Sequence, residues 1–209
     1  MRIAALHANH YKHFIFRVIM KNSARNPALK AIFLSDNYFF CSGISSIRMS
    51  SYLIDEKSDL GIIFQNNGDT DIYFIHLQSS TLRSDLIKKT IAEEKICVVM
   101  LDDIIDGCFF NFSGITWSST KLTLEQLKTI TNYEHIPAIK KISARERYVA
   151  QKLHLSDRYF ASHFDITVKS AGSYRRNLIN KLHLQKRNPA AIYRIQSCII
   201  ASNCRRPIH

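Results

Sequence analysis

The chain has 209 residues, and its apolar content of 46% is ordinary, so we expect one or two small domains with packed cores. Its formal net charge of +12 at pH 7 is unevenly distributed. Residues 139–209 hold 15 of the 29 Lys and Arg residues but only 3 of the 17 Asp and Glu residues, whereas residues 1–138 hold 14 of each. This asymmetry indicates a basic unit for a polyanion joined to a neutral unit, although a merely solvated basic face is the alternative.

The cysteines and the N-terminal apolar run argue against a disulfide-stabilised, zinc-binding or membrane-spanning protein. The five cysteines show neither a CxxC pair nor Cys/His ligand spacing, so neither a disulfide framework nor zinc is indicated: Cys41, Cys97, Cys108, Cys198 and Cys204. The apolar run at residues 14–20 is interrupted by Arg17 and is too short to span a bilayer. We therefore expect a cytoplasmic protein with reduced thiols and no membrane partner.

The first two thirds of the chain alternate strand and helix signals. Residues 1–28 form a His-rich, basic N-terminal extension, within which Met20 is an alternative start. After them we expect, in order, a strand at 29–35, a helix at 36–53, strands at 61–64 and 71–77, a helix at 81–94, strands at 96–101 and 108–112, and a helix that begins at Thr123. This alternation predicts an α/β unit with a parallel sheet.

Residues 35–44, SDNYFFCSGI, resemble the opening of a response-regulator receiver domain. The resemblance implies a receiver-like, flavodoxin-like α/β domain over residues 29–130. Only about six residues separate the strands expected at 61–64 and 71–77, so the helix between them is expected to be missing.

The same resemblance implies a phosphorylation site that this chain has lost. The acid pair that would hold Mg²⁺ is reduced to Ser35-Asp36, and His76 occupies the phosphoacceptor position. No hydroxyl follows the strand at 96–101, and the lysine position falls near Asn111. We therefore expect a degenerate receiver that is not phosphorylated, with Asp36 as a helix N-cap and His76 as a structural histidine.

Residues 131–141 are expected to be a linker between the two parts of the chain. The pattern of residues 156–184 predicts two helices joined by a turn. Ser156 and Thr167 are good N-caps, and Asp165-Ile166 is expected to form the turn. One side of the second helix is apolar, with Ala171, Leu178 and Leu182. The other side carries polar and basic residues: Lys169, Ser170, Ser173, Arg176, Asn177 and Asn180.

Residues 142–184 are similar to the LuxR/NarL-type helix-turn-helix, through ISARERYV at 142–149, SDRYFA at 156–161, FDIT at 164–167, YRRNL at 174–178 and Lys181-Leu182. The resemblance implies an all-α, four-helix DNA-binding domain over residues 142–202, followed by a tail at 203–209. Two departures are a segment 151–155 shorter than the family pattern and Gly172, where the family often has a lysine. Gly172 is expected to remove a base contact.

A last helix is expected at residues 190–201, with an apolar side of Ile192, Ile195, Ile199 and Ile200. In the family this helix dimerises. Two readings therefore stay open for this stripe: it covers the core of its own domain, or it also pairs with a partner.

The DNA-binding roles follow from the resemblance and from the helix faces. Lys169, Ser170, Ser173 and Arg176 are expected at base edges, because residues near the N-terminus of a helix in the major groove reach them. Phosphate contacts are expected from four residues: Arg158, Arg175, Asn177 and Lys181. Arg145 and Glu146 are expected to form an internal pair.

The sequence thus predicts a sequence-specific transcription regulator that binds double-stranded DNA, needs no cofactor or metal, and is not an enzyme. No catalytic triad or Gly-rich phosphate loop is present, and the spacing of His7, His10 and His13 is weak evidence for metal. The chain resembles the RcsA/BglJ/RmpA/MatA-like auxiliary regulators, which implies a homodimer or a heterodimer with the response regulator of the Rcs phosphorelay at capsule, fimbrial or virulence promoters. The alternative is a protein-interaction module that sequesters a partner regulator and binds DNA only non-specifically.

Overall fold

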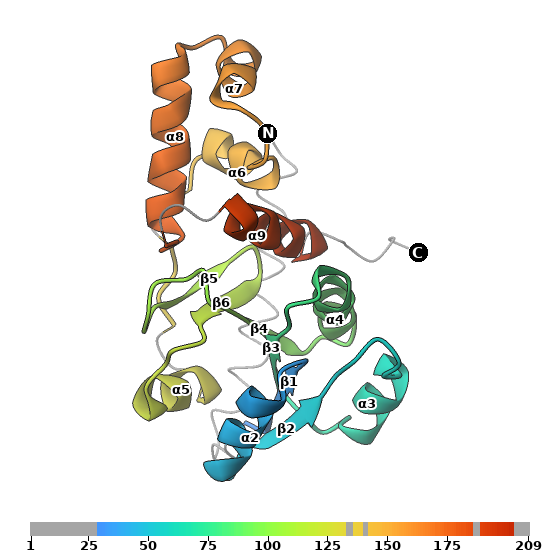
Figure 1. The fold of residues 1–209 in the computed structure, drawn as a ribbon. Helices are drawn as coiled ribbons and strands as arrows, with labels where there is room; N and C mark the ends of the chain where they lie inside the picture. The colour runs from blue at the N-terminus through green and yellow to red at the C-terminus, as the bar shows by residue number, and fades with distance from the viewer. Residues whose placement is uncertain (1–28, 133–135, 140–141, 186–188, 203–209) are drawn as a thin grey trace.

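The computed structural model describes residues 29–132, 136–139, 142–185 and 189–202 (Figure 1). The N-terminal extension 1–28 with its alternative start at Met20, part of the expected linker, and the tail 203–209 with Cys204 lie outside these residues.

A six-stranded sheet forms the centre of the first part, in the order β2-β1-β3-β4-β6-β5. Five strands run parallel: β1 (Ala31–Ser35), β2 (Ser50–Leu53), β3 (Ile72–His76), β4 (Ile96–Leu101) and β6 (Ile115–Ser119). The strand β5 (Phe109–Phe112) pairs antiparallel with β6. The parallel strands follow the flavodoxin-like order, so the fold of this part is receiver-like.

Helices cover both faces of the sheet (Figure 1). On one face, Phe33 and Phe74 pack with Leu127 of α5 (Leu124–Thr131) and with Phe40 of α2 (Tyr38–Ser46). On the other face, Tyr73 stacks on Phe64 of α3 (Leu60–Asn66), and α4 (Ser80–Ala92) adds buried leucine and isoleucine. Both faces of β3 and β4 are therefore buried, which explains their continuous apolar runs.

Two expected elements were wrong in the region between β1 and β3. The helix expected at 36–53 ends at Ser46, and β2 begins at Ser50 after Arg48, which has a positive φ of 62°. The strand expected at 61–64 is the helix α3, which Asp59 caps by accepting hydrogen bonds from the backbone N–H groups of Gly61 and Ile62. A short apolar run does not distinguish a strand from a buried helix, and here the cap decides. The helix expected to be missing is therefore present.

The end of the sheet also differs from the expectation. The fifth strand is followed at once by β6, which the sequence analysis missed, and the two form a hairpin through Ser113 and Gly114. Both turn residues have positive φ, 53° and 80°, as the tight two-residue hairpin turn requires. Trp117 of β6 is buried against the sheet.

Four helices form the rest of the described chain: α6 (Ala144–Gln151), α7 (Asp157–Phe164), α8 (Val168–Lys181) and α9 (Pro189–Ser202). Their apolar side chains belong to one continuous core with the α3/α4 side of the sheet. Ile195 and Ile199 of α9 are buried in this core, whereas Ile200 is exposed. The reading that the α9 stripe covers its own molecule therefore holds for Ile195 and Ile199.

Direct contacts tie the α-helical part to the sheet. Arg194 of α9 makes a two-pronged ion pair with Asp103 after β4, with Nε–Oδ2 and Nη2–Oδ1 distances of 2.7 Å each. Arg83 of α4 is fully buried and donates from Nε to the Cys198 sulfur of α9 at 3.2 Å. The loop after β4 also pairs its backbone with residues 183–185, for example Gln185 N–H with the Asp103 carbonyl at 2.7 Å.

Among the described residues, Cys41, Cys97, Cys108 and Cys198 are free thiols, and all but Cys108 are buried. None of the described helices has both the length and the apolar character that a membrane crossing demands.

Candidate nucleic-acid interface

The segment from Ser156 to Lys181 folds as two helices joined by a tight turn, and the predicted caps are present. Ser156 Oγ accepts from the Tyr159 N–H at 3.2 Å, and Thr167 Oγ1 accepts from the Ser170 N–H at 3.1 Å. Asp165 ends α7 in the left-handed conformation with a φ of 51°, which turns the chain sharply into α8. Ile166 is half-buried in the corner, as expected.

Two faces of α8 differ in the way the sequence predicted. Ala171, Leu178 and, after the helix end, Leu182 are buried. The exposed side carries most of the residues that we expected to contact DNA: Lys169, Ser170, Arg176 and Asn177, with Ser173 half-buried between them. Arg158 is exposed in the first turn of α7.

The side chains of Arg176 and Ser173 are held by hydrogen bonds within α8. Arg176 donates from Nη2 to Ser173 Oγ at 3.1 Å, and the Ser173 hydroxyl donates to the Lys169 carbonyl at 3.1 Å. The guanidinium plane of Arg176 is therefore oriented by its own helix. This arrangement reduces the rotamer entropy that a contact by Arg176 would cost.

Arg175 lies on the inner side of α8 and has internal partners. Its Nε is 2.8 Å from Asp157 Oδ1, it donates from Nη2 to the Leu155 carbonyl, and its guanidinium lies 5.6 Å from the Phe160 ring centroid. These contacts fix α8 against the start of α7. The structure thus gives Arg175 a positioning role, in place of the phosphate contact expected from the sequence.

Lys181 also pairs inside the molecule. Its Nζ lies 2.7 and 2.8 Å from the two carboxylate oxygens of Glu146, which is buried. Glu146 and Ser143 form a capping box at the start of α6. Burial raises the pKa of Glu146, but the hydrogen bonds from Lys181 and Ser143 outweigh it and leave that pKa below its ordinary value.

Gly172 corrects an expectation. It is buried on the α7 side of α8, where an added Cβ would lie 3.1 Å from Asp157 Oδ2. A side chain at this position would point at α7, so Gly172 removes no base contact. Its role is the close approach of the two helices.

Arg145 differs from the expectation that it pairs with Glu146. Residues one apart in a helix do not share a face, so Glu146 is buried while Arg145 is exposed. Arg145 donates from Nη1 to the Tyr174 hydroxyl at 3.3 Å and lies 5.7 Å from the Phe164 ring centroid. Arg145 therefore places a positive charge beside α8. This position was predictable from the sequence, because neighbouring residues in a helix face different sides.

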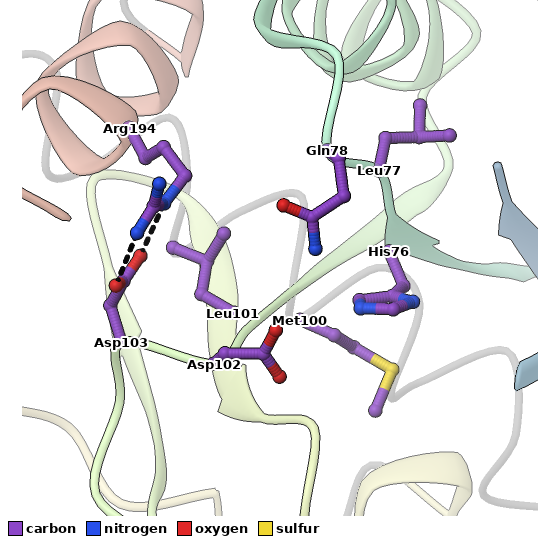
Figure 2. A pocket seen from close by; sticks show the side chains of 8 residues that line it. All are labelled: His76, Leu77, Gln78, Met100, Leu101, Asp102, Asp103 and Arg194. Carbon is purple, nitrogen blue, oxygen red and sulfur yellow. Dashed lines mark hydrogen bonds and ion pairs between the residues drawn. The ribbon is translucent and has the colours of Figure 1, made fainter. Parts of the chain in front are cut away.

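A second polar site lies at the carboxyl ends of β3 and β4, where a cavity of about 70 Å³ opens between the sheet and α9. Figure 2 shows His76, Gln78 and Asp102 around this space, while Arg194 turns to Asp103. His76, at the expected phosphoacceptor position, is 6% exposed, and its Nδ1 is 3.0 Å from Ser35 Oγ. Burial lowers the pKa of His76 and outweighs the negative charges of Asp102 and Asp36, which raise it.

The structure corrects two further expectations about the receiver-like part. Asn37, and not Asp36, caps α2, while Asp36 Oδ2 accepts from the N–H groups of Gln78 and Ser79. Because β6 is the last parallel strand, the lysine position falls beyond Ser119 and not at Asn111. Although no hydroxyl follows β4 in sequence, Thr120 after β6 reaches Asp102 Oδ1. Among the described residues, no group of three or more His, Cys, Asp or Glu could hold a metal ion.

Two solved response regulators are similar to this chain. RcsB of Salmonella typhimurium, from a structure on conformational dynamism for DNA interaction, has a TM-score of 0.31 and 12% identity, and the match covers 79% of this chain and 97% of that one. ChrA, the response regulator of a heme-sensing two-component system, has a TM-score of 0.26 and 14% identity, over 80% and 96% of the two chains. Neither a protein-family model nor a curated protein matches the chain.

Proposed function

We propose that this chain is a DNA-binding transcription regulator of the cytoplasm, without enzymatic activity, whose helix α8 enters the major groove. The observation that carries the proposal is the polar face of α8, where Lys169 is exposed, Arg176 bonds to Ser173, and the opposite side is buried and apolar. An α-helix fits the major groove, and the basic charge of residues 139–209 suits the phosphate backbone.

Within this proposal, the residues divide into contact and positioning roles. Lys169, Ser170, Ser173 and Arg176 contact base edges, because they share one side of α8 and the first three lie in its N-terminal half. Three exposed side chains, Asn177, Arg158 and Arg145, contact phosphates. Arg175 and Lys181 act through Asp157 and Glu146 by fixing α8 in place.

The receiver-like part acts without phosphorylation. The end of β3 presents the buried imidazole of His76, and its neighbour across the sheet is the Ser35 hydroxyl. Neither supplies the carboxylate that an acyl phosphate requires. The partner that the sequence resemblance implies is a second copy or a response regulator such as that of the Rcs phosphorelay.

The test is a footprint of the purified chain on promoter DNA and on a random-sequence library, over a series of salt concentrations. We expect protection of defined sites, with a linear decrease of log affinity with log salt from phosphate contacts. Acetyl phosphate should leave both the mass and the footprint unchanged. Uniform protection of all sequences would contradict the proposal, and so would a phosphorylated residue on which protection depends.

The alternative, a protein-interaction module with only non-specific DNA affinity, loses one of its supports because Gly172 faces α7. One observation still favours it: Tyr38 and Phe39 at the start of α2 are 66% and 83% exposed. A binding experiment with candidate response regulators, in the absence of DNA, separates the two functions. Tight binding together with uniform protection of DNA would favour the alternative.

A further inference from the structure

The strand β2 is an open edge of the sheet. It pairs with β1 on one side, and no strand of the described chain pairs with its other side. The opposite edge differs, because Asn111 of β5 exchanges backbone hydrogen bonds with Pro137 and Ile139, which cover it. Open edges with exposed apolar side chains pair with other strands unless something prevents it.

The backbone of β2 fixes which groups face outward. The Ile54 N–H donates to the Ser35 carbonyl of β1 at 2.7 Å, so Ile54 and, by alternation, Tyr52 turn their backbone groups toward β1. Ser51 and Leu53 therefore turn their N–H and C=O groups away from the sheet. An incoming strand can bond only to these two residues.

This alternation of inward-facing and outward-facing backbone groups favours one register for antiparallel pairing of β2 with β2 of a second copy. When Ser51 lies opposite Leu53 of the second copy, both outward residues of each strand are paired, and Tyr52 lies opposite Tyr52 at the two-fold axis. Arg48 lies in the turn before β2 and Glu56 in the turn after it, so this pairing brings the Arg48 turn of each copy to the same end of the joined strands as the Glu56 turn of the other. Both residues are exposed, and neither makes an ion pair within the described residues.

The side chains of the edge suit this arrangement. Tyr52 and Leu53 are 41% and 54% exposed although they belong to a strand, and Ile47 just after α2 and Ile62 of α3 are also exposed. The Tyr52 hydroxyl donates to Asn67 Oδ1, so Tyr52 lies on the α3 face, where facing tyrosines form a cross-strand aromatic pair. Leu53 shares the α2 face with Ser51, whose hydroxyl donates to the Cys41 carbonyl.

We propose that β2 pairs antiparallel with β2 of a second copy of this chain, so that the two sheets join across a two-fold axis with Arg48 of each copy against Glu56 of the other. The charges select this partner, because Arg48 precedes the strand and Glu56 follows it, so antiparallel self-pairing joins opposite charges at both ends. β2 and α8 lie at opposite ends of the molecule (Figure 1), so the pairing leaves the exposed face of α8 open.

The test uses charge reversal in the full chain, with mass measured by light scattering or sedimentation over a range of concentrations. The unaltered chain should be a dimer. Arg48→Glu places Glu against Glu56, and Glu56→Arg places Arg against Arg48, so each should raise the dimer dissociation constant about tenfold or more. The double variant and an equimolar mixture of the two single variants should both restore dimers.

Lys128→Glu on α5 is the matched control, because it makes the same change of charge as Arg48→Glu at an exposed position outside β2 and its flanking turns, and it should leave the dimer intact. Circular dichroism of each variant reports folding, and the mixture protects the test against a variant that is merely less stable. A monomeric chain at all concentrations would overturn the proposal, as would a dimer that Arg48→Glu leaves unchanged or a mixture that does not pair. These outcomes do not depend on DNA binding.

Discussion

Arg176 is the residue on which sequence-specific recognition is expected to depend most. Arg176 is exposed, and its Nη2 donates to Ser173 Oγ, which limits the orientations that the guanidinium can take. A guanidinium of this kind can pair with the two acceptors of a guanine edge.

We expect Arg176→Ala to weaken specific binding by about 1–3 kcal/mol and to relax the preference at one base pair. The measurement is a competition experiment with a library of operator variants. Lys128→Ala removes an exposed charge from α5 and should change neither affinity nor preference. Unchanged operator affinity in the Arg176 variant would exclude a base contact by this residue.

Glu146 stabilises the contact between α6 and α8. Its carboxylate is buried, caps α6 and pairs with Lys181, and its pKa in the folded protein lies below the ordinary value. A lowered folded pKa contributes stability at pH values above the ordinary pKa. That stability is lost as the pH falls through the lowered pKa.

We expect Glu146→Gln, which can keep the capping box, to lower the free energy of unfolding at neutral pH by about 2 kcal/mol. The difference from the unaltered chain should shrink as the pH falls through the lowered pKa of Glu146, because protonation then removes the same charge. Urea denaturation at a series of pH values measures this. A difference that stays constant down to acid pH would contradict the assignment.

At the scale of elements, the packing of α7 on α8 depends on the close approach at Gly172. A Cβ at this position would lie 3.1 Å from Asp157 Oδ2 of α7, and the ion pair with Arg175 limits how far that carboxylate can move. Alanine is otherwise favoured over glycine inside a helix by about 1 kcal/mol. Helix propensity and packing therefore oppose each other at this position.

A double-mutant cycle separates the two effects. Gly172→Ala alone should lower the free energy of unfolding slightly, because Asp157 and Arg175 must shift. In an Asp157→Ala background the same change should raise it by about 1 kcal/mol, since only propensity remains. The same effect in both backgrounds would show that Asp157 does not limit the approach.

At the scale of the whole molecule, α9 joins the helical part to the sheet. Asp103 is 5% exposed and depends on Arg194 for its neutralisation, while burial of Ile195 and Ile199 adds apolar contact. The hydrogen bonds with Asp103 raise the pKa of Arg194, so the guanidinium stays charged.

We expect Arg194→Met to lower the free energy of unfolding by about 3 kcal/mol, because it leaves a buried carboxylate without a partner. Lys88→Met, which breaks an exposed pair with Asp85, is the matched control and should change stability by less than about 0.5 kcal/mol. Urea denaturation measures both. An equal, small effect of the two variants would show that the Asp103–Arg194 pair does not hold the parts together.

The sequence by itself determined the elements whose signals are local. The strands β1, β3 and β4 follow from continuous apolar runs, and the two helices after Ser156 and Thr167 follow from a capping residue and a periodic apolar side. The exposed face of α8 was predictable for the same reason, because a helix of known start and period fixes which side chains share a side.

Only the tertiary structure decided which cations are engaged inside the molecule and how the ambiguous segments fold. Arg175 and Lys181 have the same spacing signals as Arg176, but Asp157 and Glu146, each far away in sequence, draw them inward. The apolar run at residues 61–64 is too short for periodicity to distinguish a strand from a helix, and the helix observed there has the local cap Asp59 and packs Phe64 on Tyr73 of β3. The spacing of residues along one helix does not reveal which distant side chains folding brings against it. For the same reason, the ion pair between Arg194 of α9 and Asp103 after β4 could not be predicted from the sequence.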